Sequence, residues 1–204
     1  MKTKTKFVDG PSRMGKSEFI KSLSKSDSSL KIVDSNFGTF YRSGIHPKGG
    51  PLLTSVVNAM SRLNNYDPSV DVYDRSPIND LVYLCMQFIS EYDPRENFIE
   101  SNFVEAFTNM IEDVFSDKFS EVDVFLLTKP MYEGYDDVIM SSPDKLKTHY
   151  YPFIRRLPNG SSTPEDLPRK QILTFVHTIN NNYIAIYSEF MKYYKVNNFF
   201  RLVP

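Results

Sequence analysis

The segment of residues 10–17, Gly-Pro-Ser-Arg-Met-Gly-Lys-Ser, constrains the fold more than any other part of the chain. It matches the pattern G-x-x-x-x-G-K-[ST], known as the P-loop, which needs a strand directly before it and a helix directly after it. The apolar run 6–9 predicts that strand, and the apolar spacing over 16–24 predicts that helix. The sequence therefore predicts a loop that binds phosphate.

Each fixed position of this loop has a physical role. Gly10 and Gly15 allow the backbone to turn tightly and to approach phosphate groups, and the successive N–H groups form an anion nest. We expect Lys16 to reach the β- and γ-phosphates and the Ser17 hydroxyl to bind Mg²⁺. ATP·Mg²⁺ is thus the expected ligand of the whole loop: Gly10, Pro11, Ser12, Arg13, Met14, Gly15, Lys16 and Ser17.

Short apolar strands alternate with helical patterns along the chain, as is typical of α/β proteins with a parallel sheet covered on both faces. We expect a P-loop NTPase-type sheet of about five strands in a single domain, residues 1–204, with a lid region over about 143–170. Besides 6–9, strands are predicted over 30–34, 70–74, 122–128 and 199–203. Besides 16–24, helices are predicted over 52–63, 77–92, 102–119 and 170–195. The last of these helices is predicted to carry one stripe of large apolar and aromatic residues: Tyr183, Ile186, Tyr187, Phe190, Met191 and Tyr194.

Three predicted strands end in carboxylates, at Asp9, Asp34 and Asp74. Ligands of such sheets bind beyond the carboxyl ends of the strands, so these residues suit a magnesium–nucleotide site. Asp74 is expected to hold Mg²⁺ or to take a proton from an acceptor hydroxyl, and Arg75 to place a cation near the phosphates. The plainer alternative is a helix-capping Asp beside a surface Arg.

Two further segments are candidates for contacts with the acceptor and the phosphates. The stretch 36–51 is rich in Gly, Ser and aromatic residues, which predicts a loop. The stretch 143–168 contains five prolines, which predicts an irregular, mobile excursion that closes over phosphates as a lid. Acceptor candidates are Phe37, Tyr41, Arg42, Tyr83 and Gln87, and lid candidates are Arg155, Arg156 and Arg169, although packing or a solvated loop would also explain them.

Composition narrows the classes of function. The formal net charge of −1 disfavours a general nucleic-acid binder without excluding one, because phosphate neutralisation needs surplus Lys and Arg. No apolar stretch approaches the ~20 residues that span a bilayer. The only cysteine, Cys85, cannot form an intrachain disulfide, and a cytoplasmic location is expected. His46, His149 and His177 show no metal-ligand spacing and are interpreted as bystanders.

Two motifs resemble those of a known superfamily. Asp9-Gly10-Pro11 followed by Met14-Gly15-Lys16 resembles the D-G-P-x-x-M-G-K of herpesvirus-type thymidine kinases, and Asp74-Arg75-Ser76-Pro77-Ile78 resembles their D-R-H-P-I. Arg13, three residues before Lys16, is similar to an arginine of some thymidylate kinases. The resemblance to this deoxynucleoside and thymidylate kinase superfamily implies a five-stranded core, a basic lid before the last helix and often a homodimer. It also suggests a viral or phage origin.

Several hypotheses follow for the acceptor. The first is a deoxynucleoside 5′-monophosphate, thymidylate-like, because its phosphate needs no strong base and Arg13 and Arg42 suit a phosphorylated acceptor. The second is a deoxynucleoside, for which Asp34 would replace the Glu that the superfamily places after the second strand. A base hydroxyl within DNA, as in some phage kinases, is the third. A regulator that binds ATP without transferring phosphate is the alternative from another class.

Overall fold

The computed structural model describes residues 4–34, 59, 61–62, 64–91, 120–154, 163–194 and 196–203. Within these residues a parallel sheet of five strands has the order β2-β3-β1-β4-β5. This confirms the predicted fold class. The strands are β1 (Lys6–Asp9), β2 (Ile32–Asp34), β3 (Val72–Asp74), β4 (Asp123–Leu127) and β5 (Asn198–Leu202).

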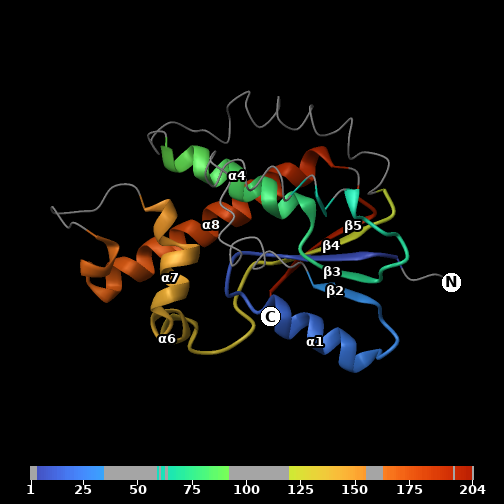
Figure 1. The fold of residues 1–204 in the computed structure, drawn as a ribbon, viewed down its shortest axis with the longest axis horizontal. Helices are drawn as coiled ribbons and strands as arrows, with labels where there is room; N and C mark the ends of the chain where they lie inside the picture. The colour runs from blue at the N-terminus through green and yellow to red at the C-terminus, as the bar shows by residue number, and fades with distance from the viewer. Residues whose placement is uncertain are drawn as a thin grey trace.

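Helices cover the two faces of this sheet (Figure 1). Helix α1 (Lys16–Ser26) lies on one face, against β1 and β3, while α4 (Pro77–Glu91) and α8 (Arg169–Tyr193) pack on each other over the opposite face. Helices α6 (Tyr135–Met140) and α7 (Pro143–His149) lie beyond the carboxyl end of the sheet, followed by the short turns η2 (Tyr151–Phe153) and η4 (Pro164–Asp166).

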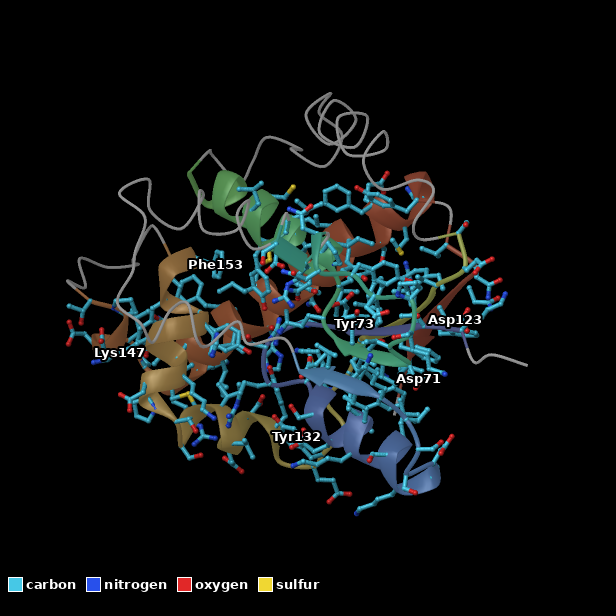
Figure 2. The ribbon with its side chains drawn as sticks, turned by 45° about the vertical axis from the view of Figure 1, so that its right-hand side comes forward. Asp71, Tyr73, Asp123, Tyr132, Lys147 and Phe153 are labelled. Carbon is cyan, nitrogen blue, oxygen red and sulfur yellow. The ribbon has the colours of Figure 1, made fainter. Side chains whose placement is uncertain are left out.

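The core forms where the apolar strands meet the aromatic stripe of α8. Val8, Val72 and Val124 of the three central strands are completely buried, as expected for strands covered on both faces. The predicted stripe of α8 is confirmed as core, with Tyr187 and Phe190 at 0% exposure. On the sheet, Tyr73 packs its ring 5.6 Å from that of Phe7 (Figure 2).

The structure corrects the prediction of an irregular segment over 143–168, because its first part is the helix α7. Pro143 stands in the first turn of α7, where its missing N–H costs nothing. The negative charge of Asp144 in the same turn interacts favourably with the positive N-terminal end of the helix dipole. Pro152 likewise stands at the second position of η2, and Pro164 at the first position of η4. The prolines start helical turns here instead of interrupting them, and α6 was not predicted at all.

The other predicted elements agree with the described residues wherever the two overlap. Residues 59, 61–62 and 64 are helical, within or just after the predicted helix 52–63. The predicted loop 36–51 and the predicted helix 102–119 lie outside the described residues. In the part of the chain that the structure describes, no helix is long and apolar enough to cross a membrane.

Candidate active site

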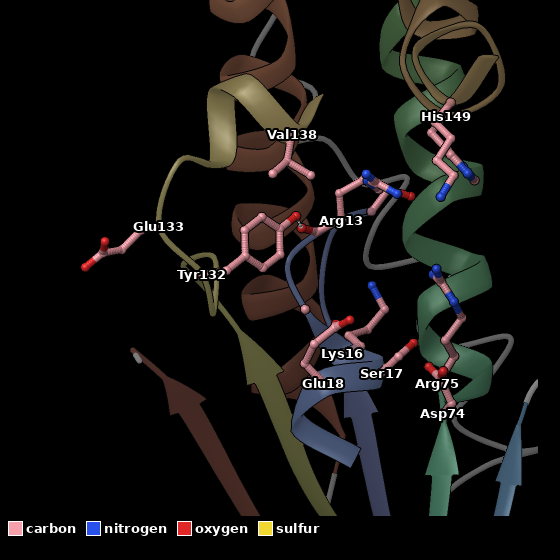
Figure 3. A pocket seen from close by; sticks show the side chains of 13 residues that line it. Arg13, Lys16, Ser17, Glu18, Asp74, Arg75, Tyr132, Glu133, Val138 and His149 are labelled. Carbon is pink, nitrogen blue, oxygen red and sulfur yellow. Dashed lines mark hydrogen bonds between the residues drawn. The ribbon is translucent and has the colours of Figure 1, made fainter. Parts of the chain in front are cut away.

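A pocket of about 680 Å³ lies at the carboxyl end of the sheet (Figure 3). Among the described residues, three parts of the chain form its walls: the P-loop with the start of α1, the end of β3, and the segment that contains α6 and α7. The loop side contributes Ser12, Arg13, Gly15, Lys16, Ser17 and Glu18. The predicted phosphate loop therefore faces a cavity in which a ligand fits.

The backbone of the P-loop has the positive φ angles that such a loop requires. Gly10 has φ 149°, Arg13 has φ 67° and Gly15 has φ 91°. A Cβ atom on Gly15 would lie 2.8 Å from the Cβ atom of Met131, so glycine is needed there for space as well as for conformation. The helix α1 begins directly after Gly15 and directs its N-terminal N–H groups at the loop.

Lys16 is folded back over the loop that precedes it. Its Nζ atom donates hydrogen bonds to the carbonyl oxygens of Gly10, at 2.9 Å, and Pro11, at 2.7 Å. The side chain is 6% exposed, and burial lowers the pKa of Lys16 well below its usual range, with the charge of Arg75 acting in the same direction. The negative charges of Asp74 and Asp9 oppose this shift, and an anionic ligand in the pocket would oppose it further.

Asp74 and Arg75 reach the pocket from the end of β3. Asp74 lies in register with Val8 of β1 on one side and with Asp34 of β2 on the other. Arg75 has φ 83°, its N–H donates to the carbonyl of Val8 at 3.1 Å, and its Nη1 donates to Asn79 Oδ1 at 2.9 Å. Burial acts to lower the pKa of Arg75, but the opposing effects of Tyr83, Asp74 and other neighbours are together larger. The pKa is therefore raised overall, and the guanidinium keeps its charge.

Asp9 is not part of the pocket, although its position at the end of β1 suggested a third carboxylate for the magnesium–nucleotide site. Its side chain is completely buried and accepts hydrogen bonds from the Ser76 N–H, at 2.9 Å, and the Tyr187 hydroxyl, at 2.5 Å. Asp9 thus joins β1 to the segment after β3 and to α8. This use of the carboxylate corrects the sequence interpretation.

The wall opposite the P-loop comes from residues 132–149. It contributes Tyr132, Glu133, Val138, Lys145 and His149. Burial lowers the pKa of His149 to about 4, and the nearby cations Arg75, Lys16, Lys145 and Arg13 act in the same direction. His149 was interpreted as a bystander, and the structure corrects this by placing it in the pocket wall. Its spacing of four residues from Lys145 would have indicated a shared helix face had α7 been predicted.

The remaining predicted site residues have different positions. Tyr83 of α4 is half-buried beside the P-loop, with its hydroxyl 3.3 Å from Ser12 Oγ and its ring stacked on Phe153. Arg169 is exposed at the start of α8, pairs with Asp137 of α6 and is not among the residues that line the pocket. Phe37, Tyr41, Arg42, Arg155 and Arg156, and the side chains of Asp34 and Gln87, lie outside the described residues.

Sequence reasoning also missed a buried ion pair near this site. Arg62 Nε donates to Asp80 Oδ2, and the Asp80 side chain is completely inaccessible. Burial raises the pKa of Asp80 to about 6 despite the opposing effect of Arg62. No sequence pattern distinguishes these two residues from an ordinary surface pair, because they are 18 positions apart on separate segments.

The residues at the pocket fit a magnesium ion bound together with phosphates. The Ser17 hydroxyl and the Asp74 carboxylate line the same cavity, and Mg²⁺ prefers one or two such oxygen ligands with phosphates and water completing its shell. Among the described residues, no group of three or more His, Cys, Asp or Glu side chains is arranged to hold a metal.

No family model and no curated protein matches the sequence. Solved structures do match: a deoxyadenosine kinase from M. mycoides with bound dCTP has a TM-score of 0.50 at 15% identity, over 97% of this chain and 89% of that one. The chain has the fold of this kinase. The same kinase with bound dATP gives a TM-score of 0.46 at 15% identity, over 97% and 90% of the two chains. The likeness to herpesvirus-type thymidine kinases and thymidylate kinases stays a prediction.

Proposed function

We propose that the chain is an ATP-dependent kinase that phosphorylates a deoxynucleoside. The observation that carries the proposal is the meeting of Lys16, Asp74 and Arg75 in one pocket at the carboxyl end of the parallel sheet. Phosphoryl transfer depends mainly on positioning and on cations that stabilise the transferred group. The pocket supplies both, since its loop is shaped for a polyphosphate and its walls carry fixed positive charge.

The P-loop is proposed to hold the triphosphate of ATP. Backbone N–H groups of residues 12–17 would contact the phosphates, and the Lys16 ammonium would leave its two carbonyl partners to contact the β- and γ-phosphates. Ser17 and Asp74 would hold Mg²⁺, which neutralises charge on the β- and γ-oxygens when bound. Arg13 and Lys145 would contact phosphate oxygens from the two sides of the pocket.

Arg75 is proposed to stabilise the charge of the phosphoryl group in transit. It is held by Asn79 and stays protonated, so it needs no rearrangement when the reaction begins. The proton of the acceptor hydroxyl would pass to a carboxylate at the strand ends. Asp34 and Asp74 are the candidates, since the register of β2 and β3 places them side by side.

The deoxynucleoside acceptor is supported by the shared fold, because a solved protein with this fold is a deoxyadenosine kinase. A 5′-monophosphate, thymidylate-like, is the second candidate. It is favoured by Arg13 and Lys145, which add two cations to the pocket beyond Lys16 and Arg75. A phosphorylated acceptor would bring the extra negative charge that such a surplus attracts.

A screen with radiolabelled ATP tests the proposal. The protein is incubated with each nucleoside, each 5′-monophosphate and a DNA duplex with hydroxymethylated bases, and the products are separated by thin-layer chromatography. Label in a deoxynucleoside monophosphate supports the first candidate, and label in a diphosphate supports the second. Label in DNA, or binding of ATP with no transfer to any acceptor, would replace the proposal by the base-hydroxyl kinase or by the nucleotide-binding regulator.

An Asp34→Asn variant then separates the two acceptor types. A deoxynucleoside kinase that uses Asp34 as its base loses turnover, because the amide cannot accept the proton. The variant Asp74→Asn removes a carboxylate that is proposed both as a Mg²⁺ ligand and as the alternative base, so its turnover is measured over a range of Mg²⁺ concentrations. Excess Mg²⁺ restores turnover after loss of a metal ligand but not after loss of the base. Equal turnover in wild type and both variants would remove the carboxylates from the proposed mechanism.

A further inference from the structure

Three consecutive carbonyl groups of the P-loop accept hydrogen bonds from a single later segment, residues 131–150. The Tyr150 hydroxyl donates to the carbonyl of Ser12 at 2.8 Å, and the Tyr132 hydroxyl donates to the carbonyl of Arg13. The backbone N–H of Met131 donates to the carbonyl of Met14 at 3.1 Å. Figure 3 shows the ring of Tyr132 directed toward Arg13.

These contacts fix the orientation of three peptide groups. A trans peptide is planar, with its C=O and the following N–H on opposite sides. Carbonyls 12, 13 and 14 are held toward residues 131–150, so the N–H groups of residues 13, 14 and 15 point away from these donors. N–H groups at these positions are the ones that form the anion nest of such a loop.

The two tyrosines act as donors throughout the physiological pH range. Burial raises the pKa of Tyr150 far above its usual value, and burial also raises the pKa of Tyr132. Neither hydroxyl therefore ionises, and a protonated phenol is free to donate to a carbonyl. Both contacts span more than a hundred residues of sequence, which ties the loop to a distant part of the chain.

Tyr150 is itself held by a buried chain of side chains that begins on α8. Asn180 Nδ2 donates to the Tyr135 hydroxyl at 2.6 Å, and the hydroxyls of Tyr135 and Tyr150 are 3.2 Å apart. Tyr150 is 1% exposed, so its position is set by packing as well as by these bonds. The same segment carries Lys145 and His149 of the opposite pocket wall.

We propose that Tyr132 and Tyr150 are positioning residues that hold the P-loop in its phosphate-binding conformation before the ligand arrives. They act through the backbone of the loop and contact no reacting atom. The proposal rests on the proposed function, because it presumes that this loop binds a polyphosphate. It adds that the pocket wall that carries α6 and α7 sets the affinity of the P-loop for a polyphosphate.

Binding of inorganic tripolyphosphate, measured by calorimetry, tests the proposal without an acceptor. Tyr150→Phe and Tyr132→Phe each remove one hydroxyl, and each is expected to weaken binding about tenfold, the effect of one lost hydrogen bond. With ATP as substrate, KM for ATP should rise by a similar factor while KM for the acceptor stays unchanged. Because Tyr132 is half-buried, its variant keeps the test open if Tyr150→Phe fails to fold.

Tyr73→Phe is the matched control, since it removes a part-buried tyrosine hydroxyl that bonds to the backbone of Asp67 and is outside both the hydrogen-bond chain of Tyr150 and the pocket lining. It is expected to lower the melting temperature while tripolyphosphate binds as in wild type. Equal affinity in wild type, Tyr150→Phe and Tyr132→Phe would overturn the proposal and leave the tyrosines a structural role. A wild type that binds tripolyphosphate but phosphorylates no acceptor would refute only the proposed kinase activity. A wild type that does not bind tripolyphosphate would refute both the kinase activity and the positioning role of the two tyrosines.

Discussion

The Oδ1 atom of Asn79 accepts a hydrogen bond from Arg75 Nη1 at 2.9 Å. The same oxygen accepts the Tyr183 hydroxyl at 2.8 Å, and Asn79 is completely buried. A guanidinium can only donate, so this contact fixes which end of the Asn79 amide faces Arg75. The direction of Arg75 in the pocket is therefore set by α4 and α8 and does not depend on a bound ligand.

Arg75→Lys is expected to lower kcat by roughly a hundredfold while the melting temperature changes little. The ammonium keeps the charge but lacks the planar fork that can contact Asn79 and a phosphate oxygen together. Steady-state kinetics with a thermal-unfolding control checks this. A lysine variant with wild-type kcat would show that only the charge of Arg75 matters.

Gly15→Ala is expected to destabilise the protein by about 1–3 kcal/mol and to weaken ATP binding. The alanine would have to keep φ 91°, and its methyl carbon would lie 2.8 Å from the Cβ atom of Met131. Gly134→Ala is the matched control, because Gly134 also has positive φ, 68°, but nothing lies within 4 Å of its added Cβ. Urea unfolding should show the larger loss for Gly15→Ala. Equal losses would mean that contact with Met131 costs nothing.

The free energy of unfolding should fall as the pH falls from about 6.5 to about 4, because of His149. Its pKa is about 4 in the folded chain against an ordinary value of 6.5. Within this window the unfolded chain binds a proton that the folded chain does not, so acid favours unfolding. The loss from this group is up to ~3 kcal/mol and is complete below pH 4.

Urea unfolding of wild type and His149→Gln at pH 7 and pH 4.5 isolates this effect. The difference between the two proteins removes the contributions of other groups, including Asp80, whose raised pKa acts in the opposite direction. The variant should lose less stability than wild type on acidification. Identical losses in the two proteins would show that His149 titrates normally in the folded chain.

The main elements of the fold were predictable because their signals are local. The strand and helix that flank the P-loop, the other apolar strands and the stripe of α8 have apolar residues at short, regular spacings, and each of these elements is confirmed. The start of the segment 143–168 was predicted to be irregular because proline has two roles: Pro143 was interpreted as a breaker, yet it occupies the first turn of α7. A proline pattern alone does not distinguish these roles.

The contacts around the site were not predictable, because they join residues far apart in the sequence. The spacing of Tyr187 correctly predicts that it lies on the stripe of α8, but nothing in the spacing shows that its hydroxyl donates to Asp9, 178 residues away. The same holds for Tyr150 and Ser12. The sequence identified the loop that faces the pocket, whereas the residues that support it became visible only in three dimensions.

The rate of phosphate transfer from ATP in wild type and Lys16→Ala tests the central claim most directly. With the best acceptor from the screen, and with folding checked by melting temperature, the account predicts clear turnover by wild type. It predicts a loss of roughly a hundredfold to a thousandfold in the variant, the effect of removing a charge that stabilises the transferred phosphate. Turnover by a folded Lys16→Ala variant at the wild-type rate would contradict the account.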